Sequence, residues 1–376
     1  MLYRFLRFAL LGAVVGLVSG GCPRSAPTAG EAPGKGGVPG PAGRRSTATV
    51  PAVGHVPLPM GDPLRQIALG SCLDQDKPQP IWASIAQYDP QLFLLMGDNV
   101  YADAETPAMF GDAYRALAAQ EGFAEMVRTT PLLATWDDHD YGRNDAGSEY
   151  PLKEEAQRFF LDFFGVPADS PRRTRPGIYD AVVVGPPGQR VQIILLDTRF
   201  FRTPLFPIAP SRYNDVDDSD ATMLGDAQWA WLAEQLKTPA ELRLLVSSVQ
   251  VVANEHDRER WGVFPHQRER LLRLIGETRA SGVVVLSGDR HRGELSRLSG
   301  SAAGYPIYDL TSSSLNRPLP AVEENSTRLG ALVTGTNYGT IDIVWEGQAH
   351  VVLALREQNG RVAVEHTVAL DALRAP

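Results

Sequence analysis

The segment LLATWDDHDYGRND, residues 132–145, joins an apolar run to a dense group of charged residues. Its first four residues have the composition of a buried strand, and Asp-Asp-His-Asp (137–140) follows almost at once. Asn144 comes shortly after. A solvated loop could hold these groups, and so could a metal site, because carboxylates, amides and imidazoles are common metal ligands. The segments on either side are needed to decide between the two.

Short apolar runs alternate with helical segments from about residue 63 onward. Apolar runs bounded by turn residues predict buried strands at 66–70, 92–97, 131–136, 191–196, 242–249 and 283–288. Helices are predicted at 106–120, 153–164, 225–236 and 265–277, the first with Thr106 as N-cap and Pro107 at its first position. After residue 305 only strands are predicted. The alternation indicates an α/β fold.

Four of the predicted strands end in residues that can bind a metal ion. These residues are Cys72, Asp98 with Tyr101, Asp138 with His139, and Asp289 with Arg290 and His291. Ligands bind at the carboxyl ends of strands in open α/β sheets, so the four segments are expected to meet at one edge. Gly97 and Gly288 each precede an Asp, and a residue without a side chain allows a tight turn there.

Each of these residues alone has a more ordinary explanation. An Asp after a strand is usually a cap or turn residue, and a Cys is usually a small buried side chain. Four such positions together favour a metal site. The candidate ligands are rich in oxygen, which favours calcium, manganese, magnesium or ferric iron over zinc. They are Asp98, Tyr101, Asp138, Asn144 and Asp289. More than one ion is expected, because carboxylates can bridge two.

Several carboxylates beside a metal pair suit the hydrolysis of phosphate esters. Cationic donors for the phosphoryl oxygens are predicted among Arg143, Arg290 and Arg292, with Arg199 and residues 172–175 as further candidates. For the arginines of 172–175, a surface ion pair is at least as good an explanation. His139 is predicted to be the general acid, or alternatively to orient a ligand. Asp137 and Asp140 are the groups expected to hold it.

Six motifs in this order resemble the alkaline phosphatase D, or PhoD-like, metallophosphatases. They are GSC (70–72), GDNVYAD (97–103), TWDDHDYGRNDAG (135–147), LLDTRFFR (195–202), LGDAQWAWLAEQL (224–236) and LSGDRHRGEL (286–295). The resemblance covers roughly residues 65–345. It implies a calcineurin-like metallophosphoesterase fold, two central mixed β-sheets flanked by helices. It also implies phosphomonoesterase and phosphodiesterase activity at alkaline pH.

The resemblance further implies which residues hold which ions. Cys72, Tyr101 and His291 would bind Fe³⁺, with Asp98 and Asp289 at or between the metals. The calcium side would take the remaining ligands, Asp138 and Asn144, and His139 keeps the place of the leaving-group acid. Mn²⁺ or Mg²⁺ could replace these ions. Asn144, Arg143 and Arg290 are the expected contacts of the substrate.

The chain departs from better-known members of the family, because it shows neither an extra N-terminal β-domain nor a clear capping helix. A more open site could favour diesters or bulkier substrates. Two alternatives to a general phosphatase remain at this point. One is a phospholipase-D-like diesterase that acts on lipid headgroups, and the other is a catalytically silent calcium-binding surface protein.

The N-terminus predicts export. Arg4 and Arg7 precede an apolar run at 8–18, and small residues precede Cys22. We expect a signal peptide over 1–21 of the lipoprotein type with Cys22 lipidated; the alternative is ordinary cleavage and secretion. Residues 22–62 are expected to form a disordered Pro/Gly-rich tether and 63–376 the metallophosphatase domain. The protein would then lie in the cell envelope, at the outer membrane or in the periplasm, or be secreted.

The net charge of −8 argues against a nucleic acid as a dedicated partner. The expected partners are small phosphate esters or phospholipid headgroups, with membrane contact only through the lipid anchor. The sequence does not indicate an oligomeric state. One long loop, 247–265, follows a predicted strand and contains Trp261 and Phe264. We interpret it as a structural loop with both aromatic side chains in the packing, although a role in lining the substrate site is open.

Overall fold

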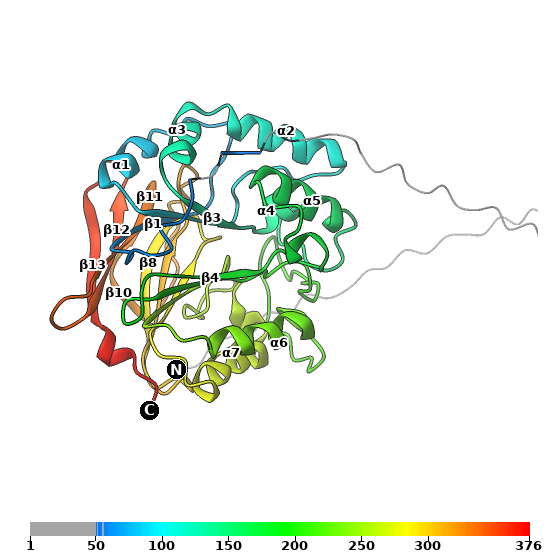
Figure 1. Cartoon of the computed structure of the whole chain (residues 1–376). Helices are drawn as coiled ribbons and strands as arrows, with labels where there is room; N and C mark the ends of the chain where they lie inside the picture. Colours follow the sequence, from blue (N-terminus) through cyan, green and yellow to red (C-terminus); the bar gives the residue numbers. More distant parts are fainter. Residues whose placement is uncertain (1–49, 51, 55) are drawn as a thin grey trace, which may run out of the picture. The chain divides into compact units, whose positions relative to one another are not determined.

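Two mixed β-sheets form the centre of this computed structural model, which describes residues 50, 52–54 and 56–376 (Figure 1). The first sheet consists of β1 (Gln66–Gly70), β2 (Leu92–Met96), β3 (Leu132–Thr135), β11 (Asn337–Val344), β12 (His350–Glu357) and β13 (Val362–Ala369). The second consists of β4 (Asp180–Val184), β5 (Val191–Leu195), β6 (Leu242–Val246), β7 (Val283–Ser287), β8 (Gly293–Leu298), β9 (Ile307–Ser312) and β10 (Arg328–Val333). Their strand orders are β13-β12-β11-β1-β2-β3 and β10-β8-β9-β7-β6-β5-β4.

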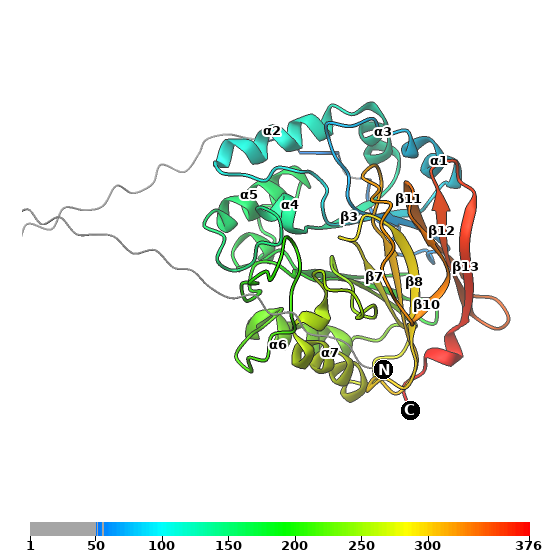
Figure 2. The same ribbon diagram turned by 180° about the vertical axis from the view of Figure 1, so that it is seen from behind.

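Helices cover the outer face of each sheet. They are α1 (Ile81–Tyr88), α2 (Pro107–Ala118), α3 (Glu121–Thr129), α4 (Asp138–Tyr141), α5 (Lys153–Phe163), α6 (Gly225–Leu236) and α7 (Pro265–Glu277). Figures 1 and 2 show α1, α2, α3 and α5 on the side of the first sheet and α6 and α7 on the opposite side. The predicted sandwich of two sheets between helices is confirmed.

The alternation of side chains along β2 explains the layers. Leu94 and Met96 belong to the apolar core shared with the second sheet, whereas Phe93 and Leu95 pack into the core beneath the helices. Successive side chains of a strand point to opposite faces, so a strand that is apolar throughout must be covered on both. The parallel neighbours are β1, β2 and β3 in the first sheet and β5, β6, β7 and β9 in the second.

The six strands and four helices predicted before residue 300 are present, with α2 beginning at Pro107. Three strands were missed, β4, β8 and β10, as were the helices α1, α3 and α4. The strand β8 reads as polar because it contains Glu294 and Ser296, yet both are buried. No α-helix follows Glu277 in the described chain, as expected.

Residues 1–49 are not among those that the structure describes, and the predicted signal peptide and Cys22 lie there. The described part of the predicted tether contacts the folded body. The backbone N–H of Val53 donates to the carbonyl of Phe163 at 2.8 Å, and the carbonyl of Met60 accepts from Gly185 at 3.1 Å. None of the described helices has the length and apolar character needed to cross a bilayer.

Candidate metal centre

The carboxyl ends of β1, β2, β3 and β7 bring potential metal ligands together. The ligand atoms within each of four groups lie within 4.8 Å of one another. These groups are Cys72, Asp98 and His291; Asp98, Asp138 and His139; Asp137, Asp138 and Asp289; and Asp138, Asp145 and Glu259. Because neighbouring groups share members, the ligands form one continuous cluster with Asp98 and Asp138 at its centre.

The backbone of the cluster is strained. Cys72, Asp98, Asp289 and His291 have φ angles of 58°, 50°, 65° and 55°, in the left-handed region that residues with a side chain seldom adopt. Such conformations cost on the order of 1–3 kcal/mol each and are found mainly at functional sites. The turn after β2 also needs Gly97, as predicted. There φ is 103°, and a Cβ atom would stand 2.6 Å from the Cβ of Asp137.

Cys72, Tyr101 and His291 form one side of the cluster, which we call the Cys72 side. The hydroxyl of Tyr101 donates to Oδ2 of Asp98 at 3.0 Å and lies 3.3 Å from Nε2 of His291. The Cys72 sulfur is 3.4 Å from the same carboxylate oxygen. The His291 ring nitrogen Nδ1 is 2.7 Å from the carbonyl of Arg317, so it carries the proton and Nε2 is left to act as a ligand. Burial lowers the pKa of His291 to about 4, which keeps the ring neutral.

Asn144, Asp145 and Glu259 form the other side, which we call the Glu259 side. The backbone N–H of Asp145 donates to Asp138 at 2.6 Å, and the Asn144 amide donates to the Asp145 carboxylate at 2.6 Å. Neither Asp145 nor Glu259 was predicted as a ligand. Asp145 lies beside the predicted Asn144 in the motif at 135–147, so the sequence alone could have indicated it as a ligand. Glu259 lies in the loop at 247–265, where no local pattern distinguishes it from its neighbours.

The electrostatics of the cluster fit bound cations. Burial, followed by the charge of Asp138, raises the pKa of Asp98 well above its ordinary value. Burial also raises the pKa of Asp289 to about 6, against the lowering effect of Arg290. The Asp137 oxygen Oδ2 is buried without a hydrogen-bond partner. The site buries several carboxylates close together, with a thiol and a phenol beside them. Their negative charges repel one another unless cations neutralise them, and bound metal ions would do so.

The structure contradicts the expected support of His139. Asp140 instead accepts the backbone N–H of Asp137, in a capping box at the start of α4, and Asp137 pairs with Arg199. The partner of the His139 ring is Asp103, whose Oδ1 lies 2.7 Å from Nδ1. Burial works against a charged ring, but three nearby carboxylates outweigh it and raise the pKa of His139 to about 10. The ring is therefore an imidazolium in the metal-free protein.

The arginines near the cluster have unlike environments. Arg290 lines the cavity and pairs with Asp289 and Glu323. Arg143 is exposed and is not among the cavity-lining residues. Arg199 is fully buried between carboxylates, and Arg292 is fully buried beside Glu323. The arginines of 172–175 lie elsewhere. Arg173 pairs with Asp162 and Arg172 with Asp180, but Arg172 is buried, and Arg175 lies over the ring of Tyr179 rather than in an ion pair with a described residue.

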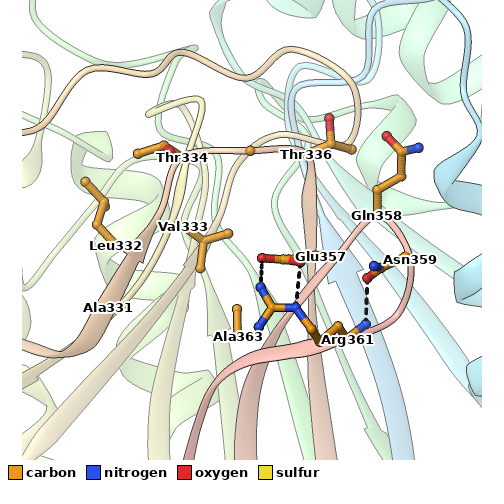
Figure 3. A pocket seen from close by; sticks show the side chains of 11 residues that line it. Ala331, Leu332, Val333, Thr334, Thr336, Glu357, Gln358, Asn359, Arg361 and Ala363 are labelled. Carbon is orange, nitrogen blue, oxygen red and sulfur yellow. Dashed lines mark hydrogen bonds and ion pairs between the residues drawn. The ribbon is translucent and has the colours of Figure 1, made fainter.

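A cavity of about 140 Å³ opens over the cluster. Its lining consists of Asp138, His139, Asn144, Asp145, Ser211, Arg258, Glu259, Asp289, Arg290, His291 and Leu319. A larger groove of about 630 Å³ lies between residues 331–336 and the β12–β13 hairpin, with an ion pair of Glu357 and Arg361 on its floor (Figure 3). We place the chemistry in the smaller cavity, because the larger groove contains none of the ligand groups.

The loop at 247–265 has the structural role proposed for it and also reaches the site. Trp261 and Phe264 are fully buried in the apolar core, as predicted. The part of the loop that precedes Trp261 in the chain contains Arg258 and Glu259, and both line the cavity. Glu259 accepts from Arg199 at 2.8 Å and lies 3.1 Å from Arg202, both in the motif at 195–202. Two arginines of that motif thus hold Glu259 in its place.

Comparisons with known proteins agree with this fold. A model of the PhoD-like phosphatases matches residues 68–367. A solved PhoD structure has a TM-score of 0.65 at 18% identity, covering 83% of this chain and 73% of its own. A purple acid phosphatase from yellow lupin seeds gives 0.59 at 13% identity, covering 83% and 55%. The anchor GAP50 of the inner membrane complex of Plasmodium gives 0.54 at 13% identity, covering 82% and 89%. No curated protein matches the chain in sequence. The chain belongs to the family of PhoD-like phosphatases and is a metallophosphoesterase.

Proposed function

We propose that this protein hydrolyses phosphate monoesters and diesters at the cluster beneath the 140 Å³ cavity. The observation that carries the proposal is the arrangement of Asp98 and Asp138 in the centre of the ligand groups, with His139 beside both. A cavity of this size accommodates a phosphoryl group but not a large organic substituent. The organic part of the ester would therefore lie outside, at the rim.

The donor atoms support two kinds of ion. The thiol, phenol and imidazole of the Cys72 side suit Fe³⁺, and the carboxylate and amide oxygens around Asp138 and Asn144 suit Ca²⁺, with Mn²⁺ or Mg²⁺ as replacements. When bound, such ions stabilise negative charge on phosphoryl oxygens and lower the pKa of water.

The side chains of the cavity have separable tasks. Asn144 and Arg290 line it and are the proposed contacts of the phosphoryl oxygens. His139 gives its proton to the leaving oxygen, and Asp103 holds the ring by its other nitrogen. Arg143, which does not line the cavity, could reach only a substituent outside it.

A phospholipid headgroup is the second candidate substrate. Leu319 stands at the cavity rim with 48% of its surface exposed, and Val322 on the same loop is 79% exposed. Exposed apolar side chains at the mouth of a site favour a substrate with an apolar part. A lipid anchor at Cys22 in the cell envelope, which we propose from the sequence, would bring the site near such molecules.

The test is an assay of the full chain with p-nitrophenyl phosphate and bis-p-nitrophenyl phosphate at alkaline pH. We expect turnover that a chelator abolishes and that added iron and calcium restore. The ratio of the two rates separates monoesterase from diesterase activity, and choline release from phosphatidylcholine vesicles tests the second candidate. A folded, metal-loaded protein that turns over none of the three would refute hydrolysis of common phosphate esters.

A further inference from the structure

Only two arginines line the cavity within the described part of the chain, Arg258 and Arg290. Arg290 is almost buried, with 9% of its side chain exposed. Its Nη1 donates to Asp289 at 3.3 Å, and its Nη2 donates to Glu323. Each terminal nitrogen thus has one carboxylate partner, and the two carboxylates offset the positive charge that Arg290 can offer to a phosphoryl group.

Arg258 has a different environment. Its side chain is 32% exposed, and its Nη1 donates to the backbone carbonyls of Pro210 and Ser211 at 3.2 Å each. Among the described residues, the closest carboxylate oxygen belongs to Asp257, 3.8 Å from Nε. Neutral carbonyls fix the position of a guanidinium without cancelling its charge. The Nη2 group has no hydrogen bond to the described residues, so its donors are available to a ligand.

The turn that holds Arg258 is itself tied to the site. Ser211 has a φ of 50°, and its hydroxyl accepts from the Asn144 amide at 3.3 Å. The carbonyl of Ser211 accepts from Arg258. The two oxygens of Ser211 therefore bind the guanidinium of Arg258 and the amide of Asn144, and all three residues line the cavity. Arginine binds phosphate with two parallel N–H donors, which needs a fixed orientation of this kind.

We infer that Arg258 is a substrate-binding residue that donates from Nη2 to the nonbridging oxygens of the phosphoryl group. The inference rests on the proposed function for its substrate, and it assigns a role to a residue outside all the sequence motifs. Leu319 also lines the cavity, and its backbone N–H is bonded to the carbonyl of His291, which places it toward the Cys72 side. The walls therefore differ in character, and an ester would enter with its charged end toward Arg258.

The experiment compares Arg258→Gln, Arg258→Lys and Arg212→Gln in the metal-loaded full chain. Arg212 is the matched control, because it lies on the same turn, pairs with Asp257 at 3.0 Å and is absent from the cavity lining. We expect Arg258→Gln to lower kcat/KM for p-nitrophenyl phosphate about 10- to 100-fold, mainly through KM. Arg258→Lys should recover part of the loss, and Arg212→Gln should stay within about twofold.

Calorimetric titration with inorganic phosphate supplies the readout that does not depend on turnover. The Kd of Arg258→Gln should rise by a similar factor, with metal content and melting temperature unchanged. Unchanged phosphate affinity, or an equal loss in Arg212→Gln, would overturn the inference. If Arg258→Gln melts early, the same titration of Arg258→Lys decides. Absence of chelator-sensitive turnover in the wild type would refute the proposed hydrolysis, and phosphate affinity would still judge Arg258.

Discussion

The two sides of the cluster are built in different ways. The Cys72 side takes its ligands from the short segments that follow β1, β2 and β7, where Cys72 and His291 have a left-handed backbone. The Glu259 side takes its ligands from two loops, held by side-chain contacts to Arg199, Arg202 and Ser211. A strand end positions a ligand through the backbone, whereas a loop needs a network of other side chains to do so. The Cys72 side should therefore tolerate distant changes better.

Removal of Asp98, which links the Cys72 side to Asp138, should have the largest effect. Asp98→Asn takes a charge from the carboxylate that contacts the Cys72 side and Asp138. We expect kcat to fall by at least about 10³-fold, with loss of metal from both sides. Metal content per chain measures this directly. A variant that keeps all its metal would show that the two sides bind their ions independently.

His139→Ala should have the next largest effect and should leave both sides loaded. Loss of a general acid costs about 10²- to 10⁴-fold when the leaving oxygen needs a proton. The loss should be large for an alkyl phosphate and small for p-nitrophenyl phosphate, whose leaving group is already stable as an anion. An equal loss on both esters would argue against a proton donor and for a structural role.

Glu259→Gln should lower the free energy of unfolding, because it weakens the contacts that hold the Glu259 side. It leaves Arg199 and Arg202, both without exposed side-chain surface, with one charged partner fewer. Breaking a buried ion pair costs about 3–5 kcal/mol, which denaturant unfolding can measure. The matched control is Glu269→Gln, whose exposed pair with Arg273 should contribute less than about 1 kcal/mol. Equal effects would mean that the network does not support the loop.

Removal of the metal should make stability depend on pH. Burial raises the pKa of Asp289 to about 6 and that of Asp145 to about 8 in the metal-free protein. The folded state then binds protons more tightly than the unfolded state, so this stability is fully present below pH 4 and is lost as pH rises through 6 to 8. For Asp289 the loss is on the order of 3 kcal/mol. The melting temperature gained on adding metal should therefore grow from pH 5 to pH 8; a constant gain would contradict this.

Asp103→Asn should have the smallest effect, about tenfold on kcat. Asp103 is one of the carboxylates that raise the pKa of His139. Its loss lowers that pKa, so the acid form disappears at a lower pH and the alkaline limb of the kcat profile moves toward neutrality. The profile measures this shift, and an unmoved limb would show that Asp103 does not set the protonation of His139.

The same contrast explains how much could be predicted from the sequence. The strands and their terminal ligands were found because continuous apolar runs end abruptly in Asp, Cys or His. The motif carrying Asp98 and Tyr101 needs no tertiary information to be placed at a strand end. The structure brings the predicted Cys72, Asp98, Tyr101, Asp138, Asp289 and His291 together, and their roles as ligands stay predictions for the assays above.

The residues that sequence analysis missed reach the site through contacts between segments that are far apart in the chain. Asp103 lies 36 residues before His139 in the chain, and nothing local marks it as a partner. The adjacent Asp140 was the plausible choice, but its carboxylate turns back to the backbone of its own helix. Arg258 and Glu259 are close to the site because a buried Trp261 anchors their loop to the core, which only the fold reveals.

The left-handed backbone at Cys72, Asp98, Asp289 and His291 narrows the routes by which such a site can change during evolution. Asp and Asn tolerate this conformation better than most residues, whereas β-branched residues do not. A drift from Cys72 to Thr would keep a small polar donor and still be costly, while a change to Asn or Asp would be accessible. Backbone geometry, as much as ligand chemistry, then limits which neighbouring sequences can bind the same ions.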